Sequence, residues 1–344
     1  MFKKSIAVSM MIVLLLVSAV ACGKANNESS SSSSSAASGS NSTDKSVTLR
    51  LGHITGDSDA WHIGALKFAE LVKEKSNGTV TVDVFPSSTL GNDRDLIEGM
   101  QLGSVDFALV AGVLSNFYEP YSILELPYLF RDEDHLKKVL YGEVGEKLQN
   151  DLLANAQIRG LEFWVRGPRE LTTNKKVEKV EDLKGLKIRV PEIPASIAAW
   201  QAMGASPTPM AFGEVYSSLQ TGVIDGQENP FALISSNKLQ EVQKYLVLTN
   251  HLYGYVQLTM SDITYQKLSP AQQKAVEEAA REATEFENNL VAENEIKLLE
   301  GLKVGGMEVI EVDTTGFAEK ASTVHADFAK KYGQELYDSI VNTK

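Results

Sequence analysis

The sequence predicts an α/β protein with two lobes, and three observations lead to this prediction. Strand-like and helix-like segments alternate over residues 46–110. The same alternation returns over residues 186–225, and a single long helix is expected after both, over residues 270–304. Alternating strands and helices are typical of parallel sheets, because parallel strands are joined by right-handed crossovers that usually contain a helix.

The first lobe is predicted to begin near Ser46, where apolar and polar residues alternate as in a half-buried strand. Ser58 stands where it can cap the first helix, and Asn77-Gly78 is a typical helix end. Pro86 stops the second strand. The expected order is strand Val47–Leu51, a helix from Ser58 to Asn77, strand Val80–Val84, helix Asn92–Leu102 and strand Val105–Val110.

The second lobe repeats this pattern. The segments Met100–Asp106 and Leu219–Asp225 both contain a helix end, a Gly or Thr-Gly and an aliphatic residue before Asp. This likeness indicates either an internal repeat or only the common form of a helix-glycine-strand junction. The expected order is strand Leu186–Val190, helix Pro194–Met203, extended segment Ser206–Pro209, helix Phe212–Thr221 and a strand starting at Val223.

The long helix has a strong start signal. Ser269 can cap it, and Pro270 suits its first turn because proline lacks the N–H that would be unpaired there. At ~1.5 Å per residue the helix would be roughly 50 Å long, which exceeds the width of one lobe. We therefore expect it to lie across both lobes as a brace, not as a pocket wall.

The charge balance narrows the function classes. The 344 residues carry a formal net charge of −12. Phosphate backbones are bound by clustered Lys and Arg, so a nucleic-acid partner is not expected. A local anion site remains open, because net charge does not describe a site.

The N-terminus predicts export. Lys3-Lys4 precedes an apolar run, Ile6–Val20, that is too short for a comfortable membrane span. Residues 1–21 therefore predict a signal peptide. The Ser-rich tether over residues 22–45 favours a lipoprotein signal with Cys22 acylated, since a flexible tether is useful when its start is fixed to a bilayer. The alternative is an ordinary signal peptide in which Cys22 is incidental.

Catalytic motifs are not found. Cys22 is the only cysteine, so thiol catalysis, disulfides and cysteine metal sites are excluded from the folded part. The sequence has no glycine-rich phosphate loop after a strand, no GxSxG and no HExxH, and its five histidines lack ligand spacing. We expect no enzyme activity, no cofactor and no metal.

Candidate binding residues stand at the ends of predicted strands, where open α/β sheets bind ligands. Arg189 ends an apolar strand, so its guanidinium is expected to be partly buried and to need an anion. That anion is either a ligand carboxylate or a nearby Asp or Glu. Arg169 is a similar but weaker candidate, and Asn229 can donate to the same carboxylate.

Several ordered motifs resemble one family, the solute-binding subunits of TRAP transporters of the DctP type. The resemblance covers about residues 46–340. The motifs are Phe85–Gly91, Leu126–Arg131, Gly185–Pro191, Gly204–Tyr216, Leu219–Gly222, Asp225–Pro230, Glu241–Tyr245 and Thr249–His251.

This resemblance implies a periplasmic-binding-protein-like fold: two α/β lobes with a cleft, crossing strands and a long helix spanning both lobes. Residues 46–166 with about 255–294 would form lobe I, and residues 167–254 with about 295–344 would form lobe II.

The resemblance also implies roles for second-lobe residues. Arg189 matches the carboxylate-binding arginine of the family, Arg169 its supporting arginine, Asn229 a carboxylate-contacting asparagine and Phe212 a cleft-wall aromatic. In the first lobe, the positions that choose the acid differ from those of sialic-acid-binding members. The first-lobe residues that could bind hydroxyl groups of a sugar acid, or a second carboxylate, are His53, Trp61, Asp93 and Arg94.

The function implied is capture of a small organic carboxylate, either a sugar acid or a C4-dicarboxylate, for ion-driven uptake through membrane subunits. The protein is expected to be a monomer on the outer face of the cytoplasmic membrane, held by its lipid in a single-membrane, Gram-positive type of cell. The alternatives are a carboxylate-binding lipoprotein of an ABC-type importer and a receptor for a sensor system.

Overall fold

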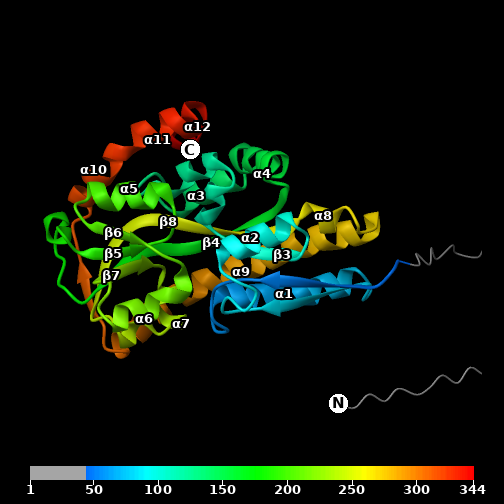
Figure 1. The fold of residues 1–344 in the computed structure, drawn as a ribbon, viewed down its shortest axis with the longest axis horizontal. Helices are drawn as coiled ribbons and strands as arrows, with labels where there is room; N and C mark the ends of the chain where they lie inside the picture. Colours follow the sequence, from blue (N-terminus) through cyan, green and yellow to red (C-terminus); the bar gives the residue numbers. More distant parts are fainter. Residues whose placement is uncertain (1–43) are drawn as a thin grey trace, which may run out of the picture. The chain divides into compact units, whose positions relative to one another are not determined.

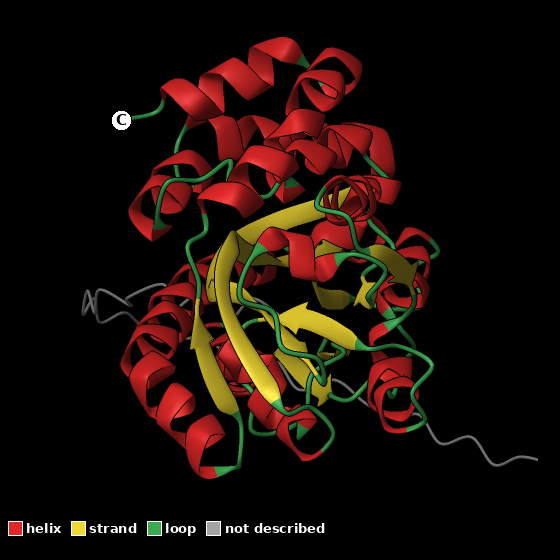
Figure 2. Ribbon diagram, turned by 90° about the vertical axis from the view of Figure 1, so that its left-hand side faces the viewer, coloured by secondary structure: helices red, strands yellow, loops and turns green. Residues whose placement is uncertain are grey.

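The structure is a computed structural model that describes residues 44–344. The predicted signal peptide, most of the predicted tether and Cys22 lie outside the described residues. Residues 44–344 form one unit. Figures 1 and 2 show this unit as a layer of strands with helices packed on both sides.

All strands of the described residues join one mixed sheet. Two parallel groups form its ends: β2, β1 and β3 at one end, and β7, β5 and β6 at the other. The order is β2 (Val80–Phe85), β1 (Val47–Gly52), β3 (Phe107–Val110), β8 (Tyr245–Ser261), β4 (Ile158–Thr173), β7 (Gly226–Asn229), β5 (Lys187–Val190) and β6 (Ser206–Pro209), with β9 (Glu308–Glu311) beside β8.

Two long antiparallel strands connect the ends of the sheet. β4 has 16 residues and β8 has 17, and they pair along most of their length. Figure 1 shows them running from the β3 side to the β5–β7 side. The implied crossing strands are therefore confirmed. The pairing register shifts between Val165 and Pro168, a bulge that reorients the side chains of this part of β4.

The first predicted helix forms as α1 (Ala60–Lys75), but its cap differs from the prediction. Asp59, not Ser58, is the N-cap, and its Oδ1 accepts a hydrogen bond from the Trp61 N–H at 3.0 Å. A carboxylate also suits the positive end of the helix dipole, which a serine does not complement with charge.

The predicted long helix forms as α9 (Pro270–Val304), capped by Ser269 through a capping box with Gln272. It packs on α1, β4 and α7 (Phe231–Ser236), so it spans both ends of the sheet as expected (Figure 1). The expectation that it forms no pocket wall is wrong, because its buried face is not fully covered and lines a cavity described below.

The predicted helices Asn92–Leu102 and Pro194–Met203 form with slightly shorter bounds. The predicted helix Phe212–Thr221 divides into a short 3₁₀ turn and α6, and the strand expected from Val223 begins only at Gly226. The helices of the described residues not yet named are α2 (Asp93–Gln101), α3 (Glu133–Leu140), α4 (Glu143–Ala156), α5 (Pro194–Ala202), α6 (Val215–Gln220), α8 (Asp262–Tyr265), α10 (Thr315–Ala321), α11 (His325–Tyr332) and α12 (Gln334–Asn342).

The C-terminal helices do not stay with the second lobe alone. Ile340 of α12 is buried in the same apolar cluster as Leu96 and Leu148, and its carbonyl oxygen lies 2.9 Å from His135 Nε2. The chain end therefore packs against residues assigned to lobe I. The exact lobe boundaries stay a prediction.

Candidate functional site

A cavity of about 50 Å³ lies where strands from both ends of the sheet finish beside β4. Its wall contains six of the eight residues that the sequence and the resemblance proposed for binding. These residues are Trp61, Asp93, Arg169, Arg189, Phe212 and Asn229.

Arg189 is positioned by β5, in which Lys187 is exposed and the three residues that follow it are buried. Its side chain is almost fully buried, with 4% of the residue exposed. Nε and Nη2 donate to the Met210 carbonyl oxygen at 3.1 and 2.7 Å, and the guanidinium carbon lies 5.6 Å from the centre of the Phe212 ring. Burial lowers the pKa of Arg189 to about 10, but the group stays charged at neutral pH.

No carboxylate of the described residues lies within salt-bridge distance of Arg189. Asp93 and Glu228 act on it only at longer range. A buried cation held by a neutral carbonyl is costly unless an anion completes its environment. The sequence left open whether the anion beside Arg189 is a ligand carboxylate or a nearby Asp or Glu. The structure therefore disfavours a protein carboxylate as the partner of Arg189.

Arg169, in contrast, has a protein carboxylate as its partner. Its Nη2 donates to Oε1 and to the carbonyl oxygen of Glu228, at 2.8 and 2.7 Å. Glu228 Oε2 also lies 2.9 Å from His251 Nε2. Burial alone would raise the pKa of Glu228, but Arg169 and His251 outweigh it and lower that pKa to about 2.

Asn229 is buried on β7, opposite Glu170 of β4. Its Nδ2 donates to Gln227 Oε1 at 2.5 Å, and Gln227 in turn donates to Thr172. This chain of hydrogen bonds fixes the amide orientation at the cavity wall, since each group has its partner already placed.

Arg166 is a site residue that the sequence reasoning missed. It lies on the β4 bulge, is 5% exposed, and its guanidinium carbon is 4.7 Å from the centre of the Trp61 ring. Within the described residues, its Nε and Nη2 are buried without a hydrogen-bond partner. The signal was available, because Arg166 directly follows the apolar strand residues Phe163–Val165.

Two acidic side chains share the wall with these arginines. Burial raises the pKa of Asp93 to about 6 and that of Glu125 to about 7. Glu125, which the sequence did not single out, packs so close to Gly112 that a Cβ there would lie 2.1 Å from its carboxyl carbon. The wall of the cavity therefore combines arginines with weakly acidic carboxyl groups.

His53 and Arg94 do not reach this cavity. His53 is fully buried, with Nε2 3.1 Å from His62 Nδ1 and Nδ1 3.1 Å from Thr55 Oγ1, and burial together with His62 lowers its pKa to about 3. Arg94 is half exposed, 3.8 Å from Glu98, and lines only a smaller space of about 20 Å³ beside Arg189.

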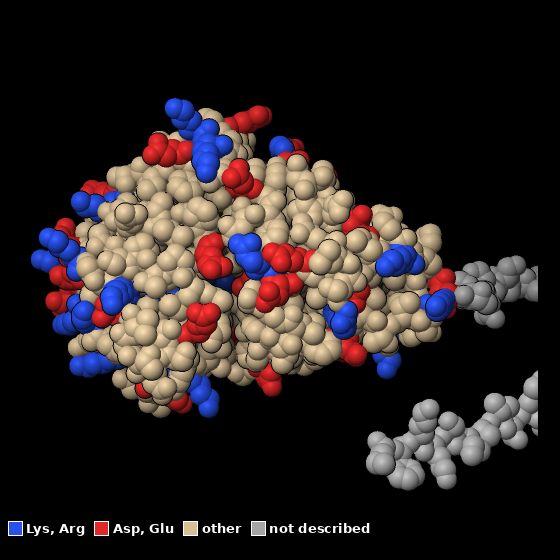
Figure 3. All heavy atoms as spheres, in the orientation of Figure 1, with Lys and Arg blue, Asp and Glu red and all other residues tan. Residues whose placement is uncertain are grey.

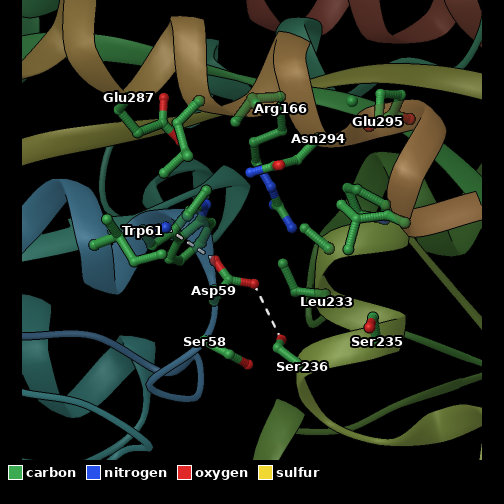
Figure 4. Close-up of a pocket in the computed structure, with 18 residues that line it drawn as sticks. Ser58, Asp59, Trp61, Arg166, Leu233, Ser235, Ser236, Glu287, Asn294 and Glu295 are labelled. Carbon is green, nitrogen blue, oxygen red and sulfur yellow. Dashed lines mark hydrogen bonds between the residues drawn. The ribbon is translucent and has the colours of Figure 1, made fainter. Parts of the chain in front are cut away.

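A second cavity, of about 180 Å³, adjoins the first (Figure 4). The two cavities share three wall residues: Trp61, Arg166 and Leu233. Asp59 faces this second cavity, where its Oδ2 accepts a hydrogen bond from Ser236 at 3.1 Å. We call this second cavity the rear chamber.

Residues 44–344 contain neither a cluster of metal-ligating side chains nor a helix suited to span a membrane. There, no three His, Cys, Asp or Glu side chains are grouped to hold a metal ion. None of the helices in this range combines the length and the apolar character needed to cross a bilayer. Figure 3 shows basic and acidic side chains interspersed on the face in view, with no large area of one sign.

Comparison with known proteins gives a consistent result. The sequence profile of the DctP family, bacterial extracellular solute-binding protein family 7, matches residues 51–331. The C4-dicarboxylate-binding periplasmic protein DctP of Rhodobacter capsulatus is 33% identical, over 86% of this chain and 90% of its own.

Two solved structures are similar throughout. A TRAP periplasmic solute-binding protein from Roseobacter denitrificans with bound L-galactonate is 40% identical, with a TM-score of 0.83 over 87% of this chain and 99% of its own. Another from Polaromonas, bound to D-erythronate, is 35% identical, with a TM-score of 0.84 over 86% and 99%.

Proposed function

This chain belongs to bacterial extracellular solute-binding protein family 7, the DctP-type solute-binding proteins of TRAP transporters, and we propose that it captures a sugar acid by its carboxylate. Arg189 carries this proposal. It is buried, charged and hydrogen-bonded only to the neutral Met210 carbonyl, so a ligand carboxylate would supply the missing anion.

The rest of the cavity supports the same role. Asn229 is held in one orientation and can donate to the carboxylate, and Phe212 packs against the Arg189 guanidinium. Arg169 is bound to Glu228, so we assign it a positioning role beside the ligand. Trp61 and Asp93 approach from the other end of the sheet, which lets one ligand contact both lobes.

A sugar acid fits this wall better than a dicarboxylate. A second carboxylate would need a second available cation near Arg189. Arg94 is close to Glu98 and outside the cavity, and the charge of Arg166 is already offset by the carboxyl groups of Asp59 and Glu125 nearby. Asp93 and Glu125, with their raised pKa values, are suited to hydroxyl groups. The R. denitrificans and Polaromonas relatives were solved with bound sugar acids. The R. capsulatus relative is a C4-dicarboxylate-binding protein, so a C4-dicarboxylate is the alternative ligand for this chain.

The proposed mechanism involves no catalysis. The ligand would shift an equilibrium between open and closed lobes, because only the closed state completes its contacts to both ends of the sheet. The closed complex, as a monomer, would then dock on the membrane subunits of the transporter. An ABC-type importer or a sensor system as its partner is the alternative.

We also propose that the protein is secreted, that residues 1–21 are removed as a signal peptide and that Cys22 is acylated. The support is the sequence alone: an apolar run, small residues before a single cysteine and a Ser-rich tether. An anchored protein of this kind suits a cell with one membrane, where a free receptor would diffuse away. The relatives named above are described as periplasmic.

The function is tested by a thermal-shift screen of residues 44–344, freed of copurified ligand, against aldonates, uronates, C4-dicarboxylates, keto acids and amino acids. A ligand at 100 times its dissociation constant adds about 2.7 kcal/mol to the stability, which is easily detected. Stabilisation by sugar acids only is expected. Stabilisation by C4-dicarboxylates only would favour the alternative, and no stabilisation by any carboxylate would contradict the proposal.

A further inference from the structure

We propose that the rear chamber is a second part of the ligand site and binds the hydroxylated tail of a long-chain sugar acid whose carboxylate lies at Arg189. This inference rests on the proposed function and extends it to the length and polarity of the ligand. The chamber is lined by α1, α7 and α9, so an occupant would contact both ends of the sheet and the helix that spans them.

The position of the chamber supports this role. Trp61, Arg166 and Leu233 line both cavities, so these side chains lie between the carboxylate site and the chamber. The chamber encloses about 180 Å³ and the carboxylate cavity about 50 Å³. Most of the space available for the rest of the ligand therefore lies behind Arg166 and Trp61.

Unpaired polar atoms give the second, independent argument. Glu287 of α9 is fully buried, and both of its carboxyl oxygens lack a hydrogen-bond partner among the described residues. The same holds for Glu295 Oε1 and for Nε and Nη2 of Arg166. Native proteins seldom leave so many buried polar atoms unpaired in one place, because each costs about 1–3 kcal/mol. Figure 4 shows these side chains arranged around the same space.

The chemistry of these atoms selects hydroxyl groups. Each hydroxyl group donates one hydrogen bond and accepts others, which matches a wall that offers guanidinium donors and carboxyl groups together. Burial raises the pKa of Glu287 well above its ordinary value and that of Glu295 to about 7, so their protonated forms are donors as well.

A second carboxylate does not fit the chamber. A second carboxylate there would lie near the carboxyl groups of Asp59, Glu287 and Glu295, and among the described residues the guanidinium of Arg166 is the one positive group in the wall to balance them. An apolar tail would leave the unpaired atoms without partners. The chamber therefore favours a polyhydroxyl chain of an aldonate over a dicarboxylate or a fatty acid.

The test measures dissociation constants by calorimetry for a series of aldonates: glycerate, erythronate, xylonate and galactonate. For the wild-type protein, affinity is expected to rise with chain length. Ala232→Leu places a larger side chain in the chamber from α7, and galactonate binding should weaken ~5- to 100-fold, as expected for overpacking. Glycerate binding should stay within about twofold, since a short acid does not need the chamber.

A polar variant pair tests the chemistry. Glu287→Leu should weaken the binding of galactonate ~2- to 10-fold per hydrogen bond lost, whereas Glu287→Gln should keep most of the affinity.

Ala202→Leu is the matched control for Ala232→Leu, because Ala202 is also a half-buried helical alanine but lines none of the cavities described above. Thermal unfolding of each variant confirms that it is folded.

The outcomes separate the two proposals. If glycerate and galactonate bind the wild-type protein equally well, or if Ala232→Leu affects both alike or neither, the chamber does not hold the tail, and the carboxylate site at Arg189 stands without it. If no aldonate binds the wild-type protein at all, the proposed function itself fails, and the chamber proposal fails with it.

Discussion

Arg169 and Glu228 form a buried ion pair between β4 and β7, with Arg169 Nη2 2.8 Å from Glu228 Oε1 and side chains only 9% and 2% exposed. The pair gives two nearby arginines different surroundings. Arg169 is neutralised within the protein, while Arg189 is equally buried but bonded only to a carbonyl. This difference is why we propose that a ligand carboxylate binds at Arg189.

Arg189→Ala should weaken binding of the sugar acid by about 2–5 kcal/mol, because the ligand carboxylate would be left desolvated without its cation. Arg189→Lys should recover only part of the loss, since an ammonium cannot form two parallel hydrogen bonds. Calorimetry on the ligand-free protein measures both. The control is Arg281→Ala, at an exposed position on α9. Near wild-type affinity in Arg189→Ala would remove Arg189 from the site.

Glu228→Gln should destabilise the folded protein by about 3–5 kcal/mol, because it leaves the buried Arg169 without its counter-charge. Urea unfolding at pH 7 measures this loss as a lower midpoint with an unchanged slope. The double variant Arg169→Gln/Glu228→Gln should lose less than the sum of the two single variants, since no unpaired charge remains. Additive losses would show that the two side chains do not interact.

The buried carboxyl group of Glu170 should make the stability of the folded protein depend on pH. It is 1% exposed, and burial raises its pKa to about 8 although its Oε2 accepts a hydrogen bond from the Asn250 N–H. Between the ordinary pKa of 4.5 and about 8, the folded state keeps a proton that the unfolded state releases. Stability should therefore fall as pH rises through this window, by at most about 1.4 kcal/mol per pH unit from this group.

Glu170→Gln removes the titrating carboxyl group, so the free energy of unfolding of this variant should change less between pH 5 and 8 than that of the wild-type protein. Urea unfolding at several pH values measures the difference. Glu319→Gln, at an exposed position, is the control and should follow the wild-type profile. Identical profiles for Glu170→Gln and the wild-type protein would show that Glu170 does not titrate in this range.

Cys22→Ser tests the proposed anchor. In cells that process lipoproteins, the wild-type protein should fractionate with membranes and move into detergent, because two acyl chains hold a protein stably on a bilayer. The serine variant should be found in the soluble extracytoplasmic fraction. If the variant still fractionates with membranes, acylation of Cys22 is not what holds the protein there.

The sequence by itself determined much of the fold. Alternating apolar residues and glycine or proline stops predicted the strands and helices of both parallel groups, because these signals act over a few neighbouring residues. The start of α9 was equally local, since Ser269 and Pro270 carry their own cap geometry. Motif resemblance then supplied the crossing strands and the family, both of which the structure and the comparisons confirm.

The tertiary structure alone decided which candidates share a cavity. His53 and Asp93 are alike in the sequence as polar residues of the first lobe, yet His53 is enclosed with His62, whereas Asp93 lines the same cavity as Arg189. The unpaired state of Arg166 and Glu287 likewise depends on α9 lying against β4, more than a hundred residues away in the chain. Burial and pairing are set by such distant neighbours, and no local sequence pattern records them.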